Sequence, residues 1–189
     1  MIRILSLIAL GLAASLPGRA SPAAAATIGG VDHAPQYDFS EFFAATDRRN
    51  FQAMVAGNPF PALADAEMRA RLLPVLQANK PRPRLTFTYG PTDTRPSYRL
   101  VLVFDAANDL GAARVCNGEA RHRPATPGTV HVFAVYCRND QPLSQATAWT
   151  AATAPEDRRL GRLFTELFLV LFTDQPLRDD RRHFLPFRR

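Results

Sequence analysis

Lysine and cysteine are scarce in this 189-residue chain, and each shortage limits what it can do. One of its 23 basic residues is a lysine, and all the others are arginines. The central part of the chain has no dense basic stripe with aromatic residues between the charges, which is the usual mark of a nucleic-acid surface. The formal net charge of +6 is therefore no reason to expect a nucleic-acid partner, and we expect none.

Motifs that carry common chemistries are also missing. The chain has neither Gly-x-x-x-x-Gly-Lys nor Gly-x-Gly-x-x-Gly, so no phosphate-binding loop is expected. Its four histidines include no His-x-x-x-His pair, and Ser144 lies outside any Gly-x-Ser-x-Gly elbow. We expect no cofactor, and the sequence favours a non-enzymatic protein without settling whether it is an enzyme.

The clearest positive signal is at the N-terminus, where residues 1–26 have the pattern of a secretory signal peptide. Arg3 precedes an apolar run over 4–16, which is too short to span a membrane comfortably. Small residues follow, with cleavage expected after Ala20 or Ala26; an uncleaved anchor is the alternative. Cleavage after Ala20 or beyond removes two arginines and leaves a charge of about +4. We expect a periplasmic or secreted protein with no transmembrane segment after cleavage.

An exported chain with two cysteines favours a disulfide between Cys116 and Cys137. Closing a loop of about 22 residues would stabilise the fold by roughly 3 kcal/mol in the chain-entropy treatment. The alternative is two buried free thiols. Cys-x-x-Cys does not occur, so a thioredoxin-like redox centre is not expected.

Hydrophobic periodicity predicts an α+β fold: a single two-layer domain with a four- to five-stranded mixed sheet and two main helices packed on one face. The domain is expected to span 39–173, after a linker over 27–38 and before a flexible basic tail over 174–189. The expected strands are 50–57, 84–89, 98–105, 130–137 and 143–153, and the expected helices are 39–46, 64–79 and 156–173.

Helix ends and core positions follow from the same patterns. Pro74 is expected to kink the second helix or to end its first half near Leu73, and Thr153 is the expected cap of the last helix. Trp149 is the one large anchor of the last strand, and His131 is expected on a sheet surface. The predicted core consists of Leu72, Leu76, Phe87, Leu100, Leu102, Phe104, Val132, Val135, Leu163, Leu167 and Phe168.

The pairing of the segments 98–105 and 130–137 decides where the candidate site residues lie. A parallel pair would place Cys137 at the same end as Asp105, within easy reach of Cys116; in an antiparallel pair, the chain would have to run nearly extended along the sheet. We favour parallel or non-adjacent strands on this argument.

Parallel strands would gather Asp105, Asp109 and Asp140 at one end of the sheet. Carboxylate oxygens are the ligands that Ca²⁺ prefers, so these three residues are the candidate ligand or metal site, with the metal left unknown. The alternative is that the aspartates cap turns.

Two functional hypotheses follow. The first is an exported non-enzymatic accessory or binding protein, whose partner is an envelope protein or an anionic membrane surface reached by the arginine-rich, aromatic tail. The second is a small exported hydrolase, or a metal- or ligand-binding enzyme, that uses the aspartates at one end of the sheet.

Overall fold

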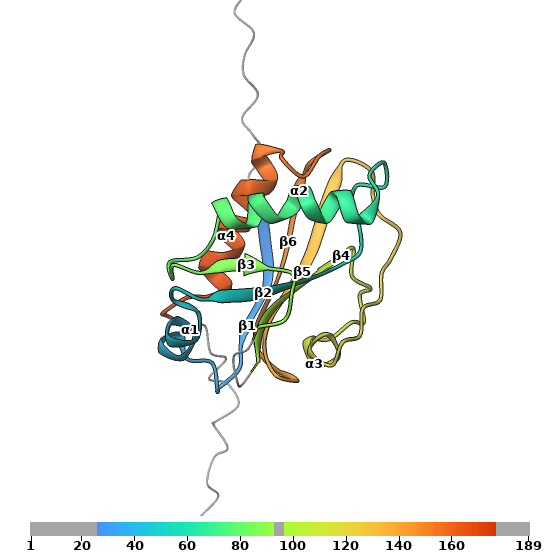
Figure 1. Cartoon of the computed structure of the whole chain (residues 1–189). Helices are drawn as coiled ribbons and strands as arrows, with labels where there is room; N and C mark the ends of the chain where they lie inside the picture. Colours follow the sequence, from blue (N-terminus) through green and yellow to red (C-terminus); the bar gives the residue numbers. More distant parts are fainter. Residues whose placement is uncertain (1–25, 93–96, 177–189) are drawn as a thin grey trace, which may run out of the picture.

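The computed structural model describes residues 26–92 and 97–176, so the predicted signal peptide and most of the predicted tail lie outside it. In this part of the chain, four helices accompany one six-stranded sheet (Figure 1). The elements are β1 Thr27–His33, α1 Phe39–Thr46, β2 Asn50–Ala56, α2 Asp65–Ala78, β3 Thr86–Thr88, β4 Tyr98–Phe104, α3 Ala112–Cys116, β5 Thr129–Arg138, β6 Gln141–Ala151 and α4 Arg158–Leu171.

The sheet is mixed, with the strand order β1-β6-β5-β4-β2-β3. Strand β2 runs parallel to both β3 and β4, and the pairs β4–β5, β5–β6 and β1–β6 are antiparallel. The α+β class is confirmed, although the sheet has one strand more than the upper end of the expected range. None of the helices in the described residues is long and apolar enough to cross a membrane.

The expected linker over 27–38 is wrong in its first half, because β1 forms the edge of the sheet beside β6. Ile28 pairs with Ala148, but the register shifts between Gly29 and Asp32, and Gly30 has φ +58°. Such an irregularity interrupts the period of two by which a strand is recognised in a sequence. Pairing with β6 therefore defines this strand more than any pattern in its own residues does.

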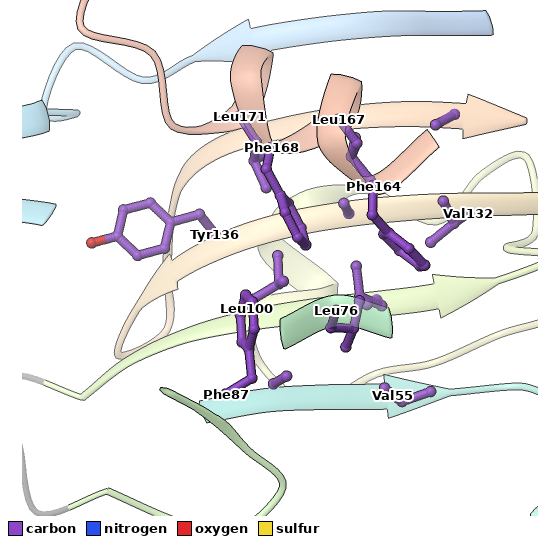
Figure 2. Packing of buried hydrophobic residues seen from close by; sticks show 14 of the residues in the cluster. Val55, Leu76, Phe87, Leu100, Val132, Tyr136, Phe164, Leu167, Phe168 and Leu171 are labelled. Atoms are coloured by element: carbon purple, nitrogen blue, oxygen red, sulfur yellow. The ribbon is translucent and has the colours of Figure 1, made fainter. Parts of the chain in front are cut away.

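Helices α2 and α4 lie together on one face of the sheet, as expected (Figure 1). Phe164, Leu167, Phe168 and Leu171 of α4 point toward the strands and share one buried cluster with Leu76 of α2 (Figure 2). All the predicted core residues are buried, and each large one contributes about 1.5–3 kcal/mol relative to full exposure. Among them, Val135 belongs to a second cluster on the opposite side of the sheet.

Two details of the helices differ from expectation. Helix α2 runs unbroken from Asp65 to Ala78, so it does not end near Leu73. Pro74 is exposed, while Leu72 and Leu76 on the other side of the helix are fully buried; their packing offsets the cost of about 3 kcal/mol for an internal proline. The cap of α4 is Asp157 rather than Thr153.

Strands β4 and β5 are antiparallel neighbours, which corrects the favoured parallel arrangement. The disulfide between Cys116 and Cys137 nevertheless forms, with their Cα atoms 5.7 Å apart. The eleven residues after Asp105 can span roughly 36 Å, which exceeds the length of the strand they must retrace. Leu110 and Val115 pack on the face of the sheet opposite α2 and α4, here called the outer face.

Candidate functional site

The three candidate aspartates do not form a cluster. Asp105 follows the end of β4, whereas Asp140 lies in the turn between β5 and β6, beside the start of β4, where Asn139 N–H donates to Ser97 O at 2.7 Å. Asp109 is exposed and forms an ion pair with Arg121 at 2.9 Å. The cluster of three aspartates was predicted from a parallel pairing of β4 and β5, and the observed antiparallel pairing places Asp105 and Asp140 at opposite ends of these strands. Across 26–92 and 97–176, no group of three His, Cys, Asp or Glu residues could hold a metal ion.

Asp105 is held by its backbone where β4 ends. Its N–H donates to His131 O at 2.9 Å, and its carbonyl accepts from Arg123 N–H at 2.8 Å. Its φ is +48°, in the left-handed region that aspartate tolerates better than most residues. The chain thus turns sharply at Asp105 while staying tied to β5 and to the segment that returns toward β5.

The side chain of Asp105 is buried, with 5% of the residue exposed. Burial raises the pKa of this carboxyl, and the nearby Arg123 and His122 only partly oppose that effect. No described residue forms a hydrogen bond with its carboxylate oxygens. These oxygens are not sealed from solvent, so they are open to a hydrogen bond from water or from a ligand in the adjoining hollow.

Asp105 lines a hollow of about 250 Å³ on the outer face. The other lining residues are Arg123, Thr126, Thr129, His131 and Trp149. They come from β5, β6 and the connection before β5, so the hollow lies where the end of β4 meets two neighbouring strands. One carboxylate, one guanidinium, two hydroxyls and two aromatic rings converge there.

His131 and Trp149 both line this hollow. They lie directly opposite each other on β5 and β6, with nearly parallel rings whose centroids are 6.1 Å apart. Nδ1 of His131 is buried and has no hydrogen-bond partner in the described structure. Burial and the charge of Arg123 lower the pKa of His131, so this imidazole is neutral at pH 7. Trp149 is 39% exposed and presents a large apolar surface to solvent.

Gly29 of β1 provides the space that the indole of Trp149 occupies on its other side. A Cβ built at Gly29 would lie 3.6 Å and 3.8 Å from Cζ3 and Cη2 of the indole. A larger side chain there would meet the ring.

A second hollow, of about 310 Å³, lies between α1 and the C-terminal ends of α2 and α4. It is bordered by apolar residues that include Leu169, which is 65% exposed. Two of its polar groups already have partners: Asn79 Oδ1 accepts from the hydroxyl of Thr165 at 2.8 Å, and Lys80 Nζ donates to Leu85 O at 3.1 Å. The outer-face hollow is the stronger candidate because a carboxyl, an imidazole, two hydroxyls and an exposed indole line it together.

The sequence analysis singled out three residues of this site, but it proposed only Asp105 as a site residue. Asp105 was a candidate ligand, His131 was expected on a sheet surface and Trp149 was taken as an anchor. Arg123, Thr126 and Thr129 were missed: the first two lie in a connection with no periodic pattern, and Thr129 begins β5 one residue before the predicted strand. Only the register between β5 and β6 brings the histidine and the tryptophan together.

Comparison with protein-family models finds no match, and comparison with curated proteins finds none. Among solved structures, a PelC dodecamer from Paraburkholderia phytofirmans matches with a TM-score of 0.42 and 14% identity, covering 79% of this chain and 99% of that one. At this level of similarity the match supports no conclusion about function.

Proposed function

We propose that this chain is an exported, non-enzymatic binding protein, periplasmic or secreted, which holds a small ligand in the outer-face hollow. The observation that carries the proposal is the convergence of a carboxyl group and an imidazole in one hollow, beside an exposed indole. The side chains of Asp105 and His131 line the hollow, so each can form a hydrogen bond with a ligand there. Trp149 can pack on the ligand's apolar surface.

Export is supported by the leader pattern and by the cysteines. A structural disulfide persists in oxidising compartments and is rare in the cytosol. Cys116 and Cys137 lie at disulfide distance, and no free cysteine occurs in the described residues. Cell fractionation followed by mass spectrometry of the N-terminus tests this part, because a cleaved chain in the periplasm or medium is expected and an intact cytosolic chain would contradict it.

A small hydrolase that uses Asp105 is the second candidate. The raised pKa of Asp105 would help it act as a general acid, and the lowered pKa of His131 would help it act as a base. The hollow contains a single carboxylate, however, and its hydroxyls come from threonines. Turnover of a bound compound that disappears in Asp105→Asn, with binding retained, would favour the hydrolase over the binding protein.

The single tryptophan makes ligand binding directly observable. Because Trp149 is the only tryptophan in the chain and lines this hollow, selectively excited tryptophan emission reports on its surroundings. We expect a screen of small neutral, cationic and anionic compounds to find at least one that changes the emission, with the change lost in His131→Ala. Met54→Ala is the matched control, since Met54 is exposed and does not line the hollow. A screen without any response in the folded protein would refute binding at this site.

A further inference from the structure

We propose that the ligand of the outer-face hollow is a neutral saccharide, bound through one sugar ring that stacks on Trp149. This inference rests on the proposed function and adds the chemical class of the ligand. A pyranose ring combines an apolar face of C–H groups with a rim of hydroxyls. The hollow offers the complementary combination, an apolar ring surface with hydrogen-bonding groups around it.

The stacking surface is preorganised. Trp149 is placed on β6 between His131 of β5 and the open backbone position at Gly29 of β1. It belongs to a continuous sheet, so little conformational freedom remains to be lost when a ligand binds. The 39% of the residue that stays exposed is the surface on which a flat apolar ligand face can lie.

The polar groups favour hydroxyls over charged ligands. A hydroxyl can donate one hydrogen bond and accept others, so adjacent hydroxyls can satisfy a carboxylate and a guanidinium at the same time. Asp105 would accept from a hydroxyl, and Arg123 would donate to one. A cationic ligand would meet the charge of Arg123, and an anionic ligand would meet the charge of Asp105. The neutral imidazole of His131 and the hydroxyls of two threonines add uncharged partners.

The size of the hollow fits one ring of a longer chain. Its volume of about 250 Å³ is just below the ~300–1,000 Å³ of pockets that enclose a drug-sized ligand. Thr126 and Arg123 at its border are exposed, and so is Trp149. A site of this form can hold one sugar residue while its neighbours extend into solvent.

Binding is tested with the purified chain and three groups of hexasaccharides. The neutral probes are maltohexaose, cellohexaose and chitohexaose; the cationic probe is chitosan hexamer, and the anionic probe is a hexamer of guluronic acid. Each is titrated to about 10 mM, which covers weak millimolar binding. Tryptophan fluorescence and calorimetry are read together. A neutral hexamer is expected to bind more tightly than both charged ones.

Variants then assign the binding to this hollow. Asp105→Ala and His131→Ala are expected to weaken calorimetric binding of that neutral hexamer about tenfold or more, because each removes a hydrogen-bond partner from a partly desolvated site. Trp149→Ala should weaken it similarly, and Trp149→Phe should restore part of the affinity. Asp109→Ala and Met54→Ala are controls outside the hollow and should bind as the parent does. Circular dichroism confirms that each variant is folded.

The outcomes separate this inference from the proposed function. If a charged probe or another small molecule changes Trp149 fluorescence while no neutral hexamer binds, the saccharide class is wrong and the binding site stands. If a neutral hexamer binds equally well to the parent and to folded His131→Ala and Trp149→Ala, it binds elsewhere and the inference is overturned. If nothing binds to the folded parent, both proposals fail.

Discussion

A single nitrogen of Arg138, Nη1, donates hydrogen bonds to both carboxylate oxygens of Glu41, at 2.9 Å and 3.0 Å. The pair ties α1 to the end of β5, and the hydroxyl of Tyr98 on β4 donates to the same carboxylate. Three elements that are distant in the sequence therefore meet at one acidic side chain. Since these side chains are only about a quarter to a third exposed, the contact is better shielded from water than the ion pair between Arg71 and Glu67 in α2.

The first prediction concerns this contact. Glu41→Gln is expected to lower the free energy of unfolding by about 1 kcal/mol, because it removes the charge that Arg138 faces. Glu67→Gln, which removes a more exposed partner of Arg71 within α2, should cost less. Urea unfolding of the two variants checks the comparison. Equal losses of unfolding free energy in both variants would show that the contact between α1 and β5 stabilises the fold no more than the exposed ion pair of α2 does.

Asp105→Asn is predicted to stabilise the protein at pH 7. Burial raises the pKa of Asp105 against the opposing effects of Arg123 and His122, with the neutral His131 also close, so the folded state binds this proton more tightly than the unfolded state does. The carboxyl's contribution is then fully present below the unfolded pKa of about 3.9 and is lost as the pH rises through the folded pKa. Asparagine avoids that loss and also tolerates the positive φ.

Thermal unfolding from pH 3 to pH 8 measures this effect. The gain is expected to be roughly 0.5–2 kcal/mol at pH 7 and to vanish toward pH 3, where Asp105 is neutral in both states. Asp109→Asn is the control of opposite sign, because the hydrogen bond and charge of Arg121 lower the pKa of Asp109. A loss of stability in Asp105→Asn at pH 7 would show that the carboxylate has a favourable partner in the folded protein.

The disulfide is predicted to contribute about 3 kcal/mol to stability through the loop of 22 residues that it closes. The double substitution of Cys116 and Cys137 by alanine should lower the free energy of unfolding by that amount. A reductant should have a similar effect on the parent and none on the variant. If reduction under conditions that break the bond leaves the parent's unfolding curve in place, the cross-link has no role in stability.

Gly57→Ala is predicted to destabilise the protein more than Gly118→Ala does. Both glycines have φ between +80° and +90°, so both substitutions incur the strain of the left-handed region. At Gly57, however, a Cβ would lie 2.8 Å from Phe104 O and 2.9 Å from Nδ1 of His122, whereas nothing lies within 4 Å at Gly118. The difference between the unfolding free energies of the two variants measures the cost of crowding Phe104 O and His122 next to Asp105. Equal values would contradict it.

Sequence patterns predicted the individual elements well wherever the period was regular. The segment 39–46 was predicted with the bounds that α1 has; β4 differs from its prediction by one residue at one end, and β5 by one residue at each end. These elements have amphipathic or strongly apolar residues whose periodicity is a local property. The strand β1 was missed because its glycines and register shift remove that periodicity, and the five-residue α3 is too short to produce one.

The candidate site was less predictable, and the disulfide shows why. Both cysteines were paired correctly, yet the direction inferred for β4 and β5 was wrong, because a covalent link limits distance and not the route that the chain takes. The route along the outer face is favoured by apolar residues, Leu110 and Val115, that cover Val101 and Val103. That preference depends on which face α2 and α4 leave uncovered, which no single segment encodes.

By itself, the sequence determined the α+β class, the helices of the main core face, the two central strands and the cysteine pair, since each depends on local periodicity or on residue identity. Tertiary structure alone decided that Asp105 and Asp140 lie apart and that His131 and Trp149 lie side by side. In an antiparallel pair, the C-terminal ends of the two strands lie at opposite ends of the sheet. Strand register then sets which side chains face each other. Both are relations between segments, so the candidate site exists only once the sheet is assembled.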